Sequence, residues 1–276
     1  DLGKQSSIDV FMRLNSGKIR LTNAELVKAL FLHYLGDSSH AEVRYLKQNE
    51  MVQQWDVIEH RLQDNEFWYF LNVNACKNDK ATRIELIFDL ISKKSNKDDE
   101  FSTFRYYDEE QDFEGYWKKI NHCFYRLLEW YEDDELYHLV GFILTRKISS
   151  LEKLWRLADG KRKSEFKQEL KKQIGQKLCA IFSTEDSEKI VSFDRLQYGE
   201  DNYDITTVLI LFNIDCHQKN LTRLSFCTYA KDSWSLEHIH AQHSKSLSDK
   251  QSQDAWYEEH GILIQSDEYQ LMIRVH

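Results

Sequence analysis

The stretch "RLTNAELVKALFLHYLG", Arg20 to Gly36, predicts a helix with both of its ends marked. Thr22 and Glu25 have the spacing of a capping box, in which each side chain bonds to the backbone N–H of the other residue. Gly36 is placed to end the helix. Between these ends, apolar residues follow one another at helical spacing, and together they form one stripe: Leu26, Val27, Leu30, Phe31 and Tyr34.

The same spacing predicts helices over most of the chain, which contains no proline to break them. The expected helices cover residues 41–62, 82–93, 116–131, 134–145, 151–157, 163–182 and 206–214. The first of these is expected to bury Val43, Leu46, Val52, Trp55 and Ile58, and "NEFWYFL" at 65–71 supplies aromatic mass for the core. Extended structure is expected in "RLSFCTYA" at 223–230 and "GILIQ" at 261–265. The expected fold class is therefore α+β and predominantly helical.

The composition indicates a cytoplasmic protein that is not inserted in a membrane. With 276 residues, 41% of them hydrophobic, the chain can bury a sizeable core. It contains no run of about 18 apolar residues, and its first residues lack the pattern of a signal peptide. The five cysteines are scattered and form no CxxC motif, which favours a reducing compartment.

The net charge of -9 hides a strong segregation of charge along the chain. Residues 98–135 contain thirteen acids and four bases, whereas residues 146–177 contain eleven bases and four acids. A basic helical segment of this kind can lie along phosphates, which makes Lys161, Arg162, Lys163 and Lys167 candidate DNA-binding residues. The alternative is a solvated helix face with no nucleic-acid partner.

A second candidate site is "RLNSGK", Arg13 to Lys18, which reads as a turn leading into a helix N-terminus. Backbone N–H groups beside cations can hold an anion, so Arg13, Asn15, Gly17 and Lys18 are candidate phosphate-binding residues. The segment is not a Walker loop, because the GxxxxGK[ST] pattern is absent. The alternative interpretation is a plain turn rich in surface charge, which would have a similar sequence.

The third candidate is "DSWSLEHIHAQHS", Asp232 to Ser244, which is either a metal-dependent nuclease centre or a polar turn rich in histidine. As a strand, it places His238 and His240 on one face and Glu237 on the other. A carboxylate that holds a divalent cation beside a histidine that accepts a proton from water is the chemistry of phosphodiester hydrolysis.

Several segments taken in order resemble the GmrSD-type modification-dependent (type IV) restriction endonucleases. They are "VFMRLNSGKIRLTNAELVKALFL", "WDVIEHRLQDNEFWYFL", "RIELIFDLI", "YWKKINHCFYRLLEWYEDDELYHLVGFIL" and "WSLEHIHAQHS". Such proteins couple a ParB-like nucleotide-hydrolysing domain to a C-terminal HNH nuclease domain. The resemblance implies that Glu237 binds Mg or Mn and that His238 is the general base. It implies that His240, Gln242 and His243 contact phosphate or the residues around the metal, and that Arg13, Asn15, Gly17 and Lys18 edge a nucleotide site.

The chain departs from this family at both ends. The Asp-Gly-Gln-Gln-Arg motif is absent before Phe11, and the Asn-bearing helix of the HNH centre is absent after Ser244. The sequence therefore looks like a fragment of such a protein. Whether the fragment itself cleaves DNA is left open. The expected parts are the end of a ParB-like domain at 1–21, a helical region at 22–148, a basic helical region at 149–222 and a partial ββα-metal (HNH) domain at 223–276.

The resemblance implies a nucleotide-regulated, Mg- or Mn-dependent endonuclease that cleaves modified foreign DNA, such as phage DNA. Its implied partners are double-stranded DNA and a nucleoside triphosphate, and homo-oligomerisation is left open. The alternative is a nucleotide-sensing or scaffold module of an anti-phage defence system that has no nuclease activity of its own.

Overall fold

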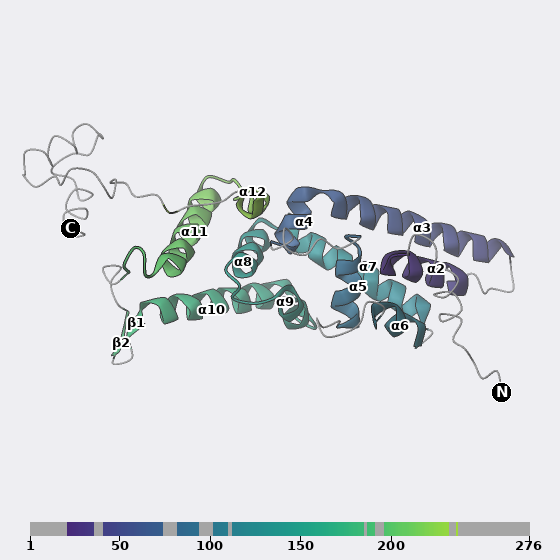
Figure 1. Cartoon of the computed structure of the whole chain (residues 1–276), viewed down its shortest axis with the longest axis horizontal. Coiled ribbons are helices and arrows are strands. Elements are labelled where there is room, and N and C mark those ends of the chain that lie inside the picture. Colours follow the sequence, from purple (N-terminus) through teal and green to yellow (C-terminus); the bar gives the residue numbers. More distant parts are fainter. Residues whose placement is uncertain are drawn as a thin grey trace, which may run out of the picture. The chain divides into compact units, whose positions relative to one another are not determined.

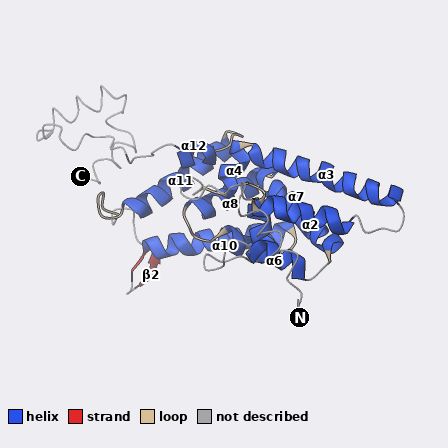
Figure 2. Cartoon of the chain, turned by 45° about the vertical axis from the view of Figure 1, so that its right-hand side comes forward, coloured by secondary structure: helices blue, strands red, loops and turns tan. Residues whose placement is uncertain are grey.

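The computed structural model describes residues 21–35, 41–73, 82–93, 102–109, 112–184, 187–190, 196–231 and 236 (Figure 1). This part of the chain is predominantly helical, as expected, and its strands form one short hairpin (Figure 2). The helices are α2 (Asn23–Leu35), α3 (Ala41–Gln63), α4 (Asn65–Leu71), α5 (Glu85–Ser92), α6 (Ser102–Glu109), α7 (Phe113–Glu132), α8 (Asp134–Thr145), α9 (Leu151–Ala158), α10 (Lys163–Phe182), α11 (Asn202–Lys219) and α12 (Phe226–Lys231). The antiparallel hairpin pairs β1 (Ser183–Thr184) with β2 (Ser187–Ile190).

The chain divides into two compact units, one of residues 1–177 with 211–233 and one of residues 178–210 with 234–276. The larger unit contains α2 to α9, most of α10, the second half of α11, and α12. In the smaller unit, the described residues form the end of α10, the hairpin and the first half of α11. The expected division into four parts stays a prediction.

Helix α7 is the central helix of the larger unit, where it packs on α2, α4, α5 and α8. The Asp112 side chain caps its N-terminus by accepting a hydrogen bond from the backbone N–H of Gly115 at 3.0 Å. Its buried residues recur every three or four positions, so that one face and both flanks enter the core. They are Phe113, Tyr116, Trp117, Ile120, Cys123, Phe124, Leu127 and Trp130.

Aromatic rings fill the core, as expected from the sequence. Trp55 of α3 stacks on Trp117 of α7 with ring centroids 6.1 Å apart. Toward α8, Tyr137 stacks on Phe70 of α4 at 5.1 Å and contacts Phe226 of α12 at the same distance. These rings come from helices far apart in sequence, so their burial joins the helices of the larger unit into one body.

The capping box at the start of α2 is confirmed. The backbone N–H of Thr22 donates to Glu25 Oε2 at 2.7 Å, and the backbone N–H of Glu25 donates to Thr22 Oγ1 at 3.2 Å. The helix begins at Asn23, and Leu26, Val27 and Phe31 are buried. The sequence thus predicts both the start and the buried face of this helix.

The expected buried face of α3 is wrong in its first half. Val43 is 44% exposed and Leu46 is 66% exposed, whereas Met51, Trp55 and Ile58 are buried. The reason is helical geometry, because at about 100° per residue Leu46 lies opposite Trp55 and Val43 lies a third of a turn away from it. These two apolar side chains therefore lie off the face of α3 that packs on the described core.

The extended structure expected at 223–230 is also wrong, since Phe226 begins the helix α12. Ser225 Oγ accepts a hydrogen bond from the backbone N–H of Thr228 at 3.1 Å, as an N-cap does. Phe226 is fully buried against Gly141, where a Cβ atom would lie 2.1 Å from the phenylalanine ring. Helix α6 was not expected, α11 is longer than predicted, and "GILIQ" lies outside the described residues.

Candidate functional site

The candidate nuclease residues Glu237, His238, His240, Gln242 and His243 lie outside the described residues. The structure does describe Leu236, which immediately precedes the candidate metal ligand and lies in neither a helix nor a strand. Within the smaller unit, the Tyr198 hydroxyl donates a hydrogen bond to the Leu236 carbonyl oxygen at 3.3 Å. The chain is thus held at the residue before Glu237 by the turn that leads into α11.

The candidate nucleotide-site residues Arg13, Asn15, Gly17 and Lys18 also lie outside the described residues. The described chain begins three residues after Lys18, and the capping box at Thr22 follows directly. In this cap, the side chains of Thr22 and Glu25 accept hydrogen bonds from each other's backbone N–H groups. The phosphate site at "RLNSGK" stays a prediction.

The acidic and basic segments of the sequence pair with each other across α7, α8 and α10 in the larger unit. Lys163 Nζ lies 2.7 Å from Glu129 Oε1, and Lys167 Nζ lies 2.9 Å from Asp133 Oδ1 and 2.8 Å from Glu135 Oε2. Lys171 Nζ completes the series, 2.6 Å from the other Glu135 oxygen. The three lysines are four residues apart and therefore share one flank of α10.

The ion pairs with lysine lower the pKa values of Asp133 and Glu135. Hydrogen bonds from Lys167 and Lys171 lower the pKa of Glu135. Burial opposes ionisation of Asp133, but its hydrogen bonds from the backbone N–H of Leu136 and from Lys167 outweigh burial and lower its pKa. Asp133 also caps α8 through the same N–H of Leu136, so one carboxylate both starts a helix and holds α10.

The four candidate DNA-binding residues therefore fall into two groups. Lys163 and Lys167 lie among carboxylates, as described above. Lys161 Nζ donates to the Leu157 carbonyl oxygen at 2.9 Å, and the largely exposed Arg162 side chain lies 3.5 Å from Glu165. Their role in DNA binding stays a prediction. The four-residue spacing of the three lysines places them on one flank of α10, but it does not indicate which acids they pair with.

A groove that the sequence pattern does not indicate lies between α9 and α10 in the larger unit. This groove has a volume of about 560 Å³ and is lined by Ile148, Ser149, Lys153, Leu157, Gln173, Gln176 and Lys177. We refer to it as the α9–α10 groove. None of its lining residues is an acid, although the segment as a whole contains four.

Within the described residues, no group of three or more His, Cys, Asp or Glu side chains is arranged to hold a metal ion. The candidate ligand Glu237 is outside that part of the chain. A search of the same part for a helix long and apolar enough to cross a bilayer found none.

His138 of α8 is buried in the larger unit, with 1% of its surface exposed. Its Nδ1 lies 2.9 Å from the Asp134 carbonyl oxygen, and its Nε2 accepts a hydrogen bond from the backbone N–H of Leu224 at 3.2 Å. Nε2 must therefore be unprotonated, which places the single ring proton on Nδ1. Tyr137 donates to the Leu224 carbonyl oxygen at 2.8 Å, so neighbouring residues of α8 bond both backbone groups of Leu224.

We expect His138 to make the protein less stable below about pH 6.5, the ordinary pKa of histidine. Burial, together with the charges of His217 and Arg223, lowers the pKa of His138 despite its bond to Asp134. As the pH falls below about 6.5, the histidine becomes protonated in the unfolded chain but stays neutral in the native protein. The free energy of unfolding therefore decreases. Carboxyl groups whose pKa is lowered affect the free energy of unfolding only below about pH 4.5, so their effect is separate from that of His138.

Urea unfolding at pH 7.5 and pH 5.5 measures this effect. His138→Asn is expected to be less stable than the wild type at pH 7.5 by about 1–3 kcal/mol, because buried partners lose their hydrogen bonds. Its stability is also expected to change less between the two pH values. His122→Asn, an exposed site on α7, is the matched control and keeps the wild-type pH dependence. If the His138 variant has the same pH dependence as the wild type, His138 is not the source of the loss of stability at low pH.

Comparison of the chain with protein-family models, with curated proteins and with solved structures found no match.

Proposed function

We propose that this chain belongs to a nucleotide-regulated, divalent-metal-dependent endonuclease that cleaves modified foreign DNA. The observation that supports the proposal is that four of the five segments carrying the resemblance contribute helices to one core. These helices are α2, the end of α3 with α4, α5, and α7 with α8. They pack on one another in the larger unit, with α7 in contact with α2, α4, α5 and α8. If the chain shares its fold with the GmrSD-type family, the segments that resemble the family are expected to pack together in one core.

The chemistry of the proposal rests on Glu237 and His238. A carboxylate is a suitable ligand for Mg or Mn, and a neighbouring imidazole is a suitable base for the water that attacks phosphorus. Together they supply the charge stabilisation and the nucleophile that phosphodiester hydrolysis requires. The hydrogen bond from Tyr198 supports the proposal, because it holds the carbonyl group of Leu236, the residue before this pair.

A cleavage assay on the intact protein tests this function. Duplex DNA with modified cytosines and the same unmodified duplex are incubated with Mg or Mn, with and without a nucleoside triphosphate. Cleavage of the modified duplex that requires metal and responds to nucleotide is the expected result. Intact modified DNA under all of these conditions would overturn the proposal.

A scaffold or sensing module is the second candidate, and the pairing of Lys163 and Lys167 with acids favours it. Lysines that are neutralised within the protein contribute less to DNA binding than exposed lysines do. In this case the cleavage assay gives no product, while calorimetry detects nucleotide binding that weakens in Asn15→Ala and Lys18→Ala.

A further inference from the structure

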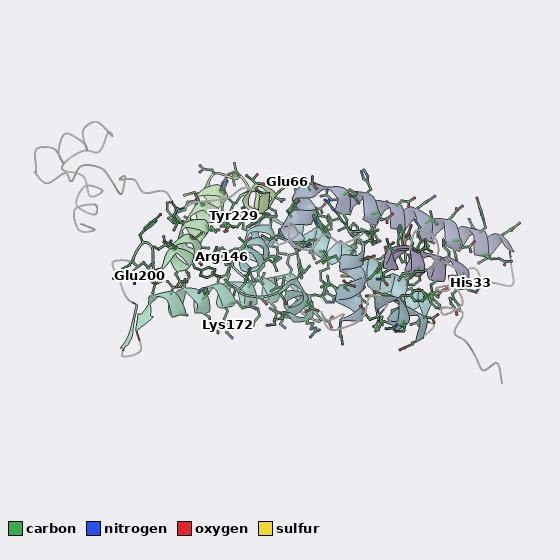
Figure 3. All side chains as sticks on the ribbon, in the orientation of Figure 1. His33, Glu66, Arg146, Lys172, Glu200 and Tyr229 are labelled. Atoms are coloured by element: carbon green, nitrogen blue, oxygen red, sulfur yellow. The ribbon has the colours of Figure 1, made fainter. Side chains whose placement is uncertain are left out.

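A groove of about 420 Å³ lies between α3 and α7 in the larger unit, and we refer to it as the α3–α7 groove. The two helices meet there through their side chains, which Figure 3 shows as sticks. The volume lies within the range of small-molecule sites, about 300–1,000 Å³. Its lining includes Glu50, Met51 and Gln54 of α3 and Trp117, Asn121 and Tyr125 of α7.

Two side-chain amides of the α3–α7 groove are held in one orientation by their partners. Trp117 Nε1, which can only donate, lies 2.6 Å from Gln54, so the bonded atom of Gln54 is its oxygen. One atom of the Asn121 amide lies 3.2 Å from this oxygen and 3.0 Å from the Trp117 carbonyl oxygen, so it must be the nitrogen. Gln54 Nε2 in turn donates to Glu50 Oε1 at 3.1 Å. Turning either amide end for end would break these bonds.

The same bonds decide which amide groups are left for a ligand. Both N–H bonds of the Asn121 amide are used, and no described residue donates to Asn121 Oδ1, so this oxygen is left as an acceptor. Gln54 Nε2 has two N–H bonds, of which Glu50 accepts one. The groove therefore offers one acceptor and one donor in fixed orientations, beside apolar surface from the buried Met51 and Trp117.

Tyr125 adds an aromatic face to this pair of amides. It follows Asn121 by one turn of α7 and therefore lies on the same side of the helix. Its side chain is 56% exposed, so a flat ligand can reach the ring. Proteins hold unpaired bases by stacking them on such rings and by bonding the edges of the bases to polar side chains.

The charges that line the α3–α7 groove cancel. Lys47 pairs with Glu114, and Lys118 and Glu50 add one charge of each sign. Beyond Tyr125, the adjoining groove is lined by one lysine and three acids, which disfavour a phosphate. The part of a ligand that the α3–α7 groove suits is therefore uncharged and aromatic.

We infer that the α3–α7 groove binds a nucleobase that carries an amino group, as adenine and cytosine do. The amine donates to Asn121 Oδ1, a ring nitrogen accepts from Gln54 Nε2, and the base stacks on Tyr125. Asparagine and glutamine are the side chains that pair with adenine in DNA recognition. The inference rests on the groove itself and goes beyond the proposed function, in which a free nucleotide and an unpaired base of DNA are both sources of such a base.

Isothermal titration calorimetry of adenosine with the intact protein, in EDTA, tests this inference. Tyr125→Ala is expected to weaken binding about 5–100-fold, the usual effect of losing one stacked base contact. Tyr125→Phe keeps the ring and is expected to bind as the wild type does. The matched control is Tyr45→Ala, which removes the same side chain from an exposed position of α3 outside the groove and is expected to leave binding unchanged.

Two further ligands separate hydrogen bonding from stacking and identify the source of the base. N6,N6-dimethyladenosine has no amine hydrogen to donate to Asn121 Oδ1, so the wild type is expected to bind it more weakly than adenosine. Asn121→Leu is expected to remove this difference between the two ligands. A single-stranded adenine oligonucleotide whose binding depends on Tyr125 would assign the base to DNA, whereas binding of adenosine alone would assign it to a free nucleotide.

Equal affinity of the wild type and Tyr125→Ala, for adenosine and for the oligonucleotide, would overturn the inference. The absence of binding of both ligands would also overturn it, and would favour an extended peptide, whose backbone offers the same kinds of donor and acceptor. Because EDTA prevents metal-dependent cleavage, base binding can succeed or fail independently of the nuclease assay.

Discussion

Replacing Trp130 with alanine is expected to lower the free energy of unfolding of the larger unit by about 3–5 kcal/mol. The side chain is 2% exposed, and its ring stacks on Phe166 with centroids 5.0 Å apart and planes 24° from parallel. This contact joins α7 to α10, close to the ion pair of Lys163 with Glu129. Truncation leaves a cavity that the surrounding helices fill only in part, so both apolar burial and ring stacking are lost.

The matched control for Trp130→Ala is Tyr125→Ala on the same helix, where the tyrosine is 56% exposed. A surface substitution of this kind is expected to change the free energy of unfolding by no more than about 0.5 kcal/mol. Urea unfolding followed by circular dichroism measures both variants. Equal effects in the two variants would contradict the role of Trp130 in joining α7 to α10.

Helices were predictable from the sequence where a cap and an apolar stripe agree. Thr22 and Glu25 mark the start of α2, and the structure contains the reciprocal hydrogen bonds that their spacing implies. Local spacing also predicted α8 with its exact bounds, because Asp133 and the apolar residues after it leave little choice of register. In these cases the information lies within one or two turns of helix, so no knowledge of the tertiary structure is needed.

Burial was harder to predict, because it depends on which helices meet. Leu46 is apolar yet 66% exposed, because at about 100° per residue it lies on the side of α3 opposite the buried Trp55. The segment around Phe226 has high strand propensity, but the space beside Gly141 favours a helix that inserts one ring. Such tertiary contacts override local propensity.

The charges were predictable as two segments but not as a pair. Glu129 and Lys163 are 34 residues apart, and only the packing of α10 on α7 and α8 brings them together. Read separately, each segment indicates a surface for a partner of opposite charge. Once the two segments are paired, the partner of these acids lies within the chain.

Replacing His238 with alanine is expected to reduce DNA cleavage by the intact protein by about 10²–10⁴-fold, the usual contribution of a general base. DNA binding and metal binding are expected to persist, because in our proposal the imidazole only accepts a proton from water. Glu237→Ala is expected to act differently, since the loss of an anionic oxygen weakens the binding of Mg or Mn itself. Excess metal should therefore restore part of the activity of the Glu237 variant but none of the activity of the His238 variant.

A titration of Mg and of Mn against cleavage rate, in the wild type and in both variants, separates these two roles. The half-saturating metal concentration is expected to rise in Glu237→Ala and to stay at the wild-type value in His238→Ala. His243→Ala serves as a comparison within the same motif, since a histidine that only contacts phosphate should weaken DNA binding more than it slows the bound reaction. Wild-type cleavage rates in His238→Ala would end the nuclease assignment for this motif. The cluster from Asp232 to Ser244 would then be a polar turn rich in histidine, and the scaffold alternative would account for the chain.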